Sequence, residues 1–152
     1  MSKLSLPVAL LALAACAPTP VVAVEDATFA ASLGVDLSQS TKIAGGMYIR
    51  ELEVGAGDEV LSTSTPKPKV TMRYTGWLTD GTQFDSNQGR GFQFTLGAGE
   101  VIQGWDIGVP GMRVGGQRQL IIPSAMGYGP SGIGPIPPNA ILVFNVTLVS
   151  TP

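Results

Sequence analysis

The sequence has no histidine and only one cysteine, and both shortages exclude classes of enzyme. Without histidine the chain has no Ser-His-Asp triad and no Cys-His pair, which are common devices for activating a nucleophile. The usual zinc sites, which rely on histidine and cysteine, are excluded as well. A single cysteine cannot form an internal disulfide. The sequence therefore argues against nucleophilic catalysis and against a metal site.

Positive charge is also scarce, because 9 lysines and arginines stand against 11 aspartates and glutamates, which gives a formal net charge of −2. Nucleic acid binding requires a basic patch. The only local basic pair is Lys67 and Lys69, which a solvated strand edge explains. We expect no nucleic-acid partner.

The first apolar run, Leu4–Ala15, follows one basic residue, Lys3, and is too short to span a bilayer. Its shape is that of a signal peptide. It ends in Leu13-Ala14-Ala15-Cys16, which resembles the bacterial lipobox, where the cysteine is lipidated and the chain is cut before it. Two other interpretations are ordinary cleavage after Ala12-Leu13-Ala14 and an uncleaved, buried segment.

We expect residues 1–15 to be a lipoprotein signal peptide and Cys16 to carry the lipid. A lipid chain holds a protein at a membrane surface without spanning the membrane. The predicted location is the bacterial cell envelope, facing the periplasm or the outer surface.

Residues 16–44 are expected to form the lipidated N-terminus and a tether, because they mix small and apolar residues without strong periodicity. Residues 26–34 could form one or two helical turns, with Asp26 as the cap and Gly34 as the stop. The apolar side chains that could dock onto the domain are Phe29, Leu33, Val35 and Leu37. No long helix is present to dimerise the chain, and we expect a monomer.

The 20 glycines and 12 prolines suit short strands joined by tight turns, and residues 45–150 are expected to form one domain. Strand patterns occur at Met47–Val54, Val70–Leu78, Gln83–Ser86, Phe92–Leu96, Gln117–Pro123 and Ala140–Val149. Residues 87–91 are expected to loop out between two of these runs. The pattern predicts an antiparallel sheet of four to six strands, about five.

A short helix is expected within residues 99–112, because Pro110 ends it and Gly108 weakens its last turn. Its apolar residues share one face, and they are Val101, Ile102, Trp105 and Val109. A helix of two to three turns is marginal in water alone. We therefore predict an α+β fold in which this helix lies across the sheet, with Trp105 at the contact.

Aromatic residues are spread over every element of the domain: Tyr74, Phe84, Phe92, Phe94, Trp105, Tyr128 and Phe144. A plain core explains each ring alone, but together they exceed what one sheet face and one short helix need. Some are expected to line a concave apolar pocket for a small ligand. Asp85 is either a turn or cap acceptor, or a polar anchor in that pocket, bonded to Tyr74 or paired with Arg90.

Six motifs in order resemble one family, the FKBP-type peptidyl-prolyl cis–trans isomerases. They are Tyr74-Thr75-Gly76-Trp77-Leu78, Gly81-Thr82-Gln83-Phe84-Asp85-Ser86, Val101-Ile102-Gln103-Gly104-Trp105, Gly127-Tyr128-Gly129, Ile136-Pro137-Pro138-Asn139-Ala140 and Leu142-Val143-Phe144. The lipobox and residues 33–37 resemble the bacterial lipoprotein branch of that family. The loop after Asp85 is shorter than in the best-known eukaryotic members of the family. The loop of residues 130–135 is also shorter, and it lacks the histidine that those members have.

The resemblance implies a strongly bent sheet wrapped around the short helix, with Trp105 at the floor of the pocket between them. The catalytic positions that it implies are Asp85, Tyr74, Tyr128, Trp105 and Phe144. The substrate-binding positions that it implies are Phe84, Phe92, Val101, Ile102 and Ile136. It also places the Ile102 N–H and the Tyr128 hydroxyl where the family hydrogen-bonds the carbonyls of a substrate or inhibitor.

The activity implied is isomerisation of X-Pro bonds, with proline-containing polypeptides as partners, macrolides such as rapamycin as inhibitors, and no cofactor. Such a protein assists the folding of secreted or envelope proteins. Two alternatives share the fold. One is a non-catalytic, chaperone-like lipoprotein that binds extended segments; the other is a small-ligand receptor or structural envelope lipoprotein.

Overall fold

The computed structural model describes residues 17–151, so the predicted signal peptide (residues 1–15) and Cys16 lie outside the described part. Within residues 17–151, six strands form one antiparallel sheet in the order β1-β2-β5-β6-β3-β4. The strands are β1 (Thr41–Lys42), β2 (Tyr48–Glu53), β3 (Lys69–Leu78), β4 (Gln83–Thr95), β5 (Gln117–Ile122) and β6 (Leu142–Ser150). The sequence predicted about five strands; β1, which is only two residues long, is too short to show an alternating pattern.

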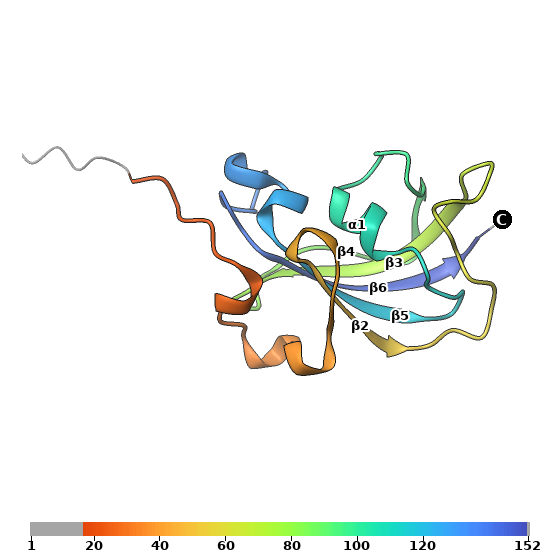
Figure 1. Ribbon diagram of the computed structural model, residues 1–152, viewed down its shortest axis with the longest axis horizontal. Coiled ribbons are helices and arrows are strands. Elements are labelled where there is room, and N and C mark those ends of the chain that lie inside the picture. Colours follow the sequence, from red (N-terminus) through yellow and green to blue (C-terminus); the bar gives the residue numbers. More distant parts are fainter. Residues whose placement is uncertain (1–16, 152) are drawn as a thin grey trace, which may run out of the picture.

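The helix α1 (Gln103–Gly108) lies across one face of the sheet (Figure 1). Its six residues make less than two turns, so the predicted length of two to three turns is wrong. The difference arises at the start, because Ile102 is extended, with ψ 148°, and caps the helix from outside. The end of the helix, just before Pro110, is as predicted.

Two glycines let α1 approach the sheet closely. A Cβ at Gly104 would lie 2.6 Å from Ile122 Cδ1, and a Cβ at Gly108 would lie 2.4 Å from Met47 Cε. A side chain at either position would force the Ile122 or Met47 side chain to move, so the glycines allow this close packing. The close contact presses Trp105, which is 4% exposed, into the main core between helix and sheet.

The strand β4 corrects the prediction that residues 87–91 form a loop. Met72 pairs with Phe92 and Tyr74 pairs with Asn87, so residues 88–91 of β4 together face Arg73 alone. This is a large bulge within one strand, and the Arg73 Nε–H donates to the Gly89 carbonyl at 3.0 Å across it. The bulge interrupts the alternation of side chains, which is why the sequence pattern indicated a break.

The other face of the sheet is covered by the N-terminal segment (Figure 1). This segment contains three 3₁₀ turns: η1 (Val24–Asp26), η2 (Ala31–Leu33) and η3 (Leu37–Gln39); a fourth, η4 (Ala44–Gly46), precedes β2. An apolar cluster separate from the main core lies on this face. It contains all four side chains that were predicted to dock: Phe29, Leu33, Val35 and Leu37. That prediction is confirmed, and the packing reaches back to Val24, ahead of the predicted domain start at residue 45.

Polar contacts also hold this segment. The Glu25 carboxylate accepts hydrogen bonds from the Lys42 ammonium and from the Tyr48 hydroxyl, and the Gln119 side-chain amide donates to the Leu33 carbonyl at 2.9 Å. Gly34 ends η2 in the left-handed conformation, with φ 59°, as the stop residue was predicted to do. The predicted cap, Asp26, is instead the last residue of η1.

Candidate functional site

A cavity of about 190 Å³ opens between α1 and the concave side of the sheet. Its lining residues come from β3, β4, β6, α1, the segment just before α1 and the connection after β5. They are Tyr74, Phe84, Asp85, Phe92, Glu100, Val101, Ile102, Trp105, Tyr128 and Phe144. The fold thus brings together residues that are up to 70 positions apart in the sequence.

The floor of the cavity is Trp105, which packs against four other rings. Its centroid lies 5.0 Å from that of Tyr74 and 5.4 Å from that of Phe144, both edge to face. Phe94 and Phe92 lie 5.7 Å and 6.4 Å away. Edge-to-face packing fixes the plane of each ring. The Trp105 indole N–H is buried and has no hydrogen-bond acceptor within residues 17–151.

Gly76 on β3 makes room for two of the wall residues. A Cβ at this position would lie 2.6 Å from Phe144 Cε1 and 2.7 Å from Phe84 Cζ. These two rings meet edge to face with centroids 5.4 Å apart. The missing side chain at Gly76 therefore determines where both phenylalanines stand.

One side of the cavity is polar. The Tyr74 hydroxyl donates to Asp85 Oδ2 at 2.7 Å, and the Ser86 backbone N–H donates to Asp85 Oδ1 at 2.8 Å. Burial, and then the hydrogen bond to Asp85, raise the pKa of Tyr74 well above its usual value, so its hydroxyl keeps its proton. Of the two partners expected for Asp85, the structure selects Tyr74; no ion pair joins Asp85 to Arg90 within the described chain.

Besides the Trp105 indole N–H, two further donors on the cavity lining are unused. Across residues 17–151, neither the Ile102 N–H nor the Tyr128 hydroxyl has a hydrogen-bond partner. Partial burial, and then the charge of Asp85, raise the pKa of Tyr128, so its hydroxyl also remains a donor at neutral pH. The cavity therefore offers an apolar ring-sized floor with two free donors at its edge, a set suited to a compact apolar group flanked by carbonyls.

Nine of the ten predicted site positions line this cavity, and the tenth does not. Ile136 is 6% exposed and belongs to the main core, although it lies in the same β5–β6 connection as Tyr128. The sequence reasoning missed Glu100, which lines the cavity while its Oε2 accepts the Thr95 N–H at 2.8 Å. Its position directly before Val101 was the available signal.

Comparison with known proteins gives one family. A family model described as FKBP-type peptidyl-prolyl cis-trans isomerase matches residues 62–149. An FK506-binding protein of Neisseria meningitidis serogroup B is 48% identical over 108 residues, which are 69% of this chain and 95% of that protein. FK506-binding protein 4 of Rhizopus delemar is 46% identical over 112 residues, 72% of this chain but only 28% of that longer protein.

Among solved structures, a peptidyl-prolyl cis-trans isomerase of Pseudomonas syringae pv. tomato is similar, with a TM-score of 0.66 and 31% identity. The match covers 80% of this chain and 86% of that one. The part of the chain that the family model matches contains β3, β4, α1, β5, all but the last residue of β6, and every residue that lines the cavity.

Proposed function

Because this chain belongs to the FKBP-type peptidyl-prolyl cis-trans isomerase family, we propose that its aromatic cavity catalyses the cis–trans isomerisation of X-Pro bonds in polypeptides. The observation that carries the proposal is the Trp105 floor with two unused donors beside it. The proline ring lies on this floor, and carbonyls of the neighbouring residues accept from the Ile102 N–H and the Tyr128 hydroxyl.

Catalysis here requires no bond to be made or broken. Rotation about an amide is opposed by a barrier of about 18–20 kcal/mol, because twisting breaks its conjugation. Uncatalysed isomerisation takes tens to hundreds of seconds, which is slow enough to limit folding. A site accelerates the rotation when it binds the twisted amide better than either planar form.

The cavity has the features for that preference. A twisted amide has less charge separation than a planar one. An apolar aromatic wall therefore favours the twisted form over the planar form more than water does. Trp105, Phe144 and Phe92 supply this wall. The Tyr74 hydroxyl and the Asp85 carboxylate are hydrogen-bonded at 2.7 Å and lie at the side of the cavity. This pair orients the polar groups around the prolyl carbonyl of the substrate.

Replacement of Asp85 tests the polar side of the site. In Asp85→Ala the Tyr74 hydroxyl loses its acceptor, and a lost hydrogen bond to a charged group costs about 1.5–3 kcal/mol. We expect kcat/KM for an X-Pro peptide to fall by about tenfold or more. The control is Asp80→Ala, because Asp80 accepts from the Thr82 N–H within the β3–β4 turn and does not line the cavity. Unchanged turnover in a folded Asp85→Ala protein would reduce Asp85 to a structural residue.

A chaperone-like protein that binds extended segments without isomerising them is the alternative, and it needs the same apolar cavity. The experiment compares two activities of one preparation: isomerisation of a short X-Pro peptide, and suppression of the aggregation of an unfolded protein that contains no proline. The proposed function predicts isomerisation of the peptide, whether or not the protein suppresses aggregation. Suppression of aggregation with no isomerisation would establish the alternative.

We also propose that the protein is a monomeric lipoprotein of the bacterial envelope, anchored through Cys16, where it assists the folding of envelope proteins. No helix within residues 17–151 is long and apolar enough to cross a membrane. Residues 17–23 separate Cys16 from the first buried residue, Val24, and reach about 25 Å at most when extended. A lipid on Cys16 therefore keeps the domain close to the membrane surface.

The anchor is tested by feeding radiolabelled palmitate to bacteria that express the chain. Labelled protein from the parent sequence, with no label in Cys16→Ser, is the expected result. Label that persists in Cys16→Ser, or no label in either protein, would contradict the anchor and leave the isomerase proposal standing.

A further inference from the structure

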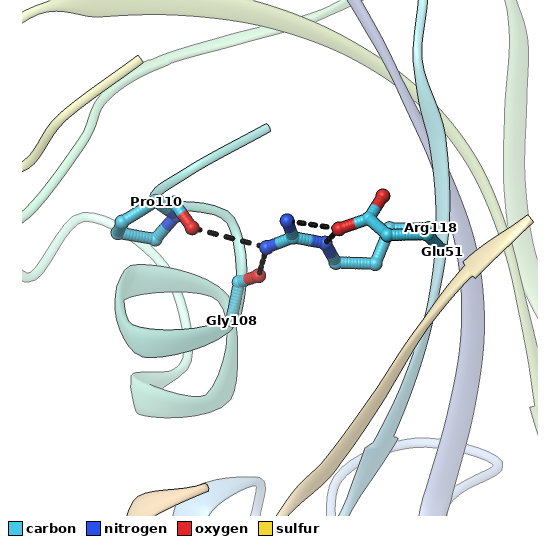
Figure 2. Close-up of polar contacts among 4 residues, drawn as sticks. All are labelled: Glu51, Gly108, Pro110 and Arg118. Atoms are coloured by element: carbon cyan, nitrogen blue, oxygen red, sulfur yellow. Dashed lines mark hydrogen bonds and ion pairs between the residues drawn. The ribbon is translucent and has the colours of Figure 1, made fainter. Parts of the chain in front are cut away.

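Arg118 is a charged residue on β5 that is only 5% exposed. Removing a guanidinium from water is costly unless its N–H groups find partners. Its partners lie on two other parts of the fold (Figure 2). Its Nε donates to Glu51 Oε1 at 2.6 Å, and its Nη2 pairs with the same carboxylate on β2.

The remaining contacts of Arg118 are with the end of α1. Its Nη1 donates to the Gly108 carbonyl at 2.6 Å and to the Pro110 carbonyl at 3.0 Å (Figure 2). Carbonyls at the C-terminal end of a helix have no partner within the helix. The planar fork of a guanidinium can bind these carbonyls and a carboxylate at the same time, which the single nitrogen of lysine does less well.

The opposite end of α1 is held in a different way. The Asp106 carboxylate accepts the Gly97 N–H at 2.7 Å and the Gly99 N–H at 2.9 Å, which ties the helix to the turn before it. A helix of six residues cannot hold its own position in water. Trp105 therefore depends on contacts at both ends of α1, and Arg118 supplies the polar contacts at the second end.

We propose that Arg118 is a positioning residue for the cavity: it fixes the end of α1 against β5 and β2 and so sets where the Trp105 indole lies beneath the substrate. The effect on turnover rests on the proposed isomerase function. Buried ion pairs are poor devices for stability alone, since apolar residues of similar volume often replace them without loss. What apolar residues cannot supply is the pair of directed bonds to the Gly108 and Pro110 carbonyls.

The test uses two variants and a matched control in the chain from residue 17 onward. Arg118→Lys keeps the charge but loses the fork, and Arg118→Met keeps the stem but leaves both carbonyls unpaired. The control is Arg113→Lys, an exposed arginine whose Nη1 donates to the Gly57 carbonyl at 3.0 Å. Three quantities are measured on folded protein: kcat and KM for an X-Pro peptide, the Kd of rapamycin, and the emission of Trp105 in a Trp77→Phe background.

We expect kcat to fall by about tenfold in Arg118→Lys, corresponding to the loss of about one hydrogen bond, and further in Arg118→Met. KM should change less than kcat, because the apolar floor remains. The Kd of rapamycin should rise and the Trp105 emission should shift in the same order, while Arg113→Lys matches the parent protein. This graded order, with partial rescue by lysine, is not expected of a residue that only adds stability.

Unchanged kcat and unchanged Trp105 emission in folded Arg118→Lys would overturn the proposal, and this variant decides the case even where Arg118→Met fails to fold. A parent protein without isomerase activity would overturn the proposed function instead. The Trp105 emission of Arg118→Lys would then still decide whether Arg118 positions the floor.

Discussion

Replacing Trp105 with alanine is expected to lower kcat/KM for an X-Pro peptide by about 10- to 100-fold, since a buried large side chain is worth about 1.5–3 kcal/mol of apolar contact. The indole is 4% exposed and touches four rings, so its removal leaves a gap beneath the bound proline. The free energy of unfolding should fall by about 3–5 kcal/mol, as for other buried aromatic residues. Peptide isomerisation and urea unfolding measure the two effects.

The chain provides its own control, because its second tryptophan, Trp77, lies on the opposite face of the sheet against the N-terminal segment. Trp77→Ala should also destabilise the fold but leave kcat/KM of the folded protein unchanged. Equal activity losses in the two variants would mean that stability, and not the cavity floor, explains the result. Full activity in folded Trp105→Ala would remove the floor from the mechanism.

Adding a single methyl group at Gly76 is expected to have the second-largest effect. In Gly76→Ala the new Cβ would meet both Phe144 and Phe84 at under 3.0 Å, so the two wall rings must move apart or the strand must shift. Overpacking of this kind costs about 1–3 kcal/mol. We expect kcat/KM to fall by about tenfold or more and the affinity for rapamycin to fall with it. Peptide isomerisation and a binding titration measure both.

Gly89→Ala is the matched control, because nothing lies within 4 Å of a Cβ at Gly89 in the bulge of β4. It should match the parent in activity. If Gly76→Ala kept full activity and affinity, the positions of Phe84 and Phe144 would not matter to catalysis or to rapamycin binding.

Much of the sheet could be predicted because side chains along its strands alternate between the two faces. In β6, Leu142, Phe144, Val146 and Leu148 all enter the main core, as the period of two requires. The prediction failed where the same residues could form either a loop or a strand. Residues 87–91 are polar and indicate a loop, but pairing with β3 on both sides of the bulge keeps them within the strand β4.

The start of α1 and the packing of the N-terminal segment depend on tertiary contacts, which periodicity does not record. Val101 and Ile102 have helical spacing, yet Ile102 is extended and both serve the cavity lining instead. The N-terminal segment packs through scattered apolar residues and through a buried glutamine, Gln119, 1% exposed, which bonds to the Leu33 carbonyl. No regular pattern in the sequence indicates such a contact.

The cavity was predictable from the family motifs, but its supports were not. Gly76 belongs to the first motif, but its role of leaving space for two rings is visible only in the fold. Arg118 lies outside all six motifs and supports the site by binding the end of α1. An arginine at a buried position of a strand interrupts the apolar pattern, so the sequence alone gives no reason for it. Only its three partners in the fold give it a role.

The first measurement to make is the isomerisation of a short X-Pro peptide by residues 17–152, with and without rapamycin. We expect catalysis that a stoichiometric amount of rapamycin abolishes, with quenching or a shift of Trp105 emission on binding of the drug. A folded protein that binds rapamycin at Trp105 but does not isomerise the peptide would rule out the proposed catalysis. The cavity would then be a binding site alone.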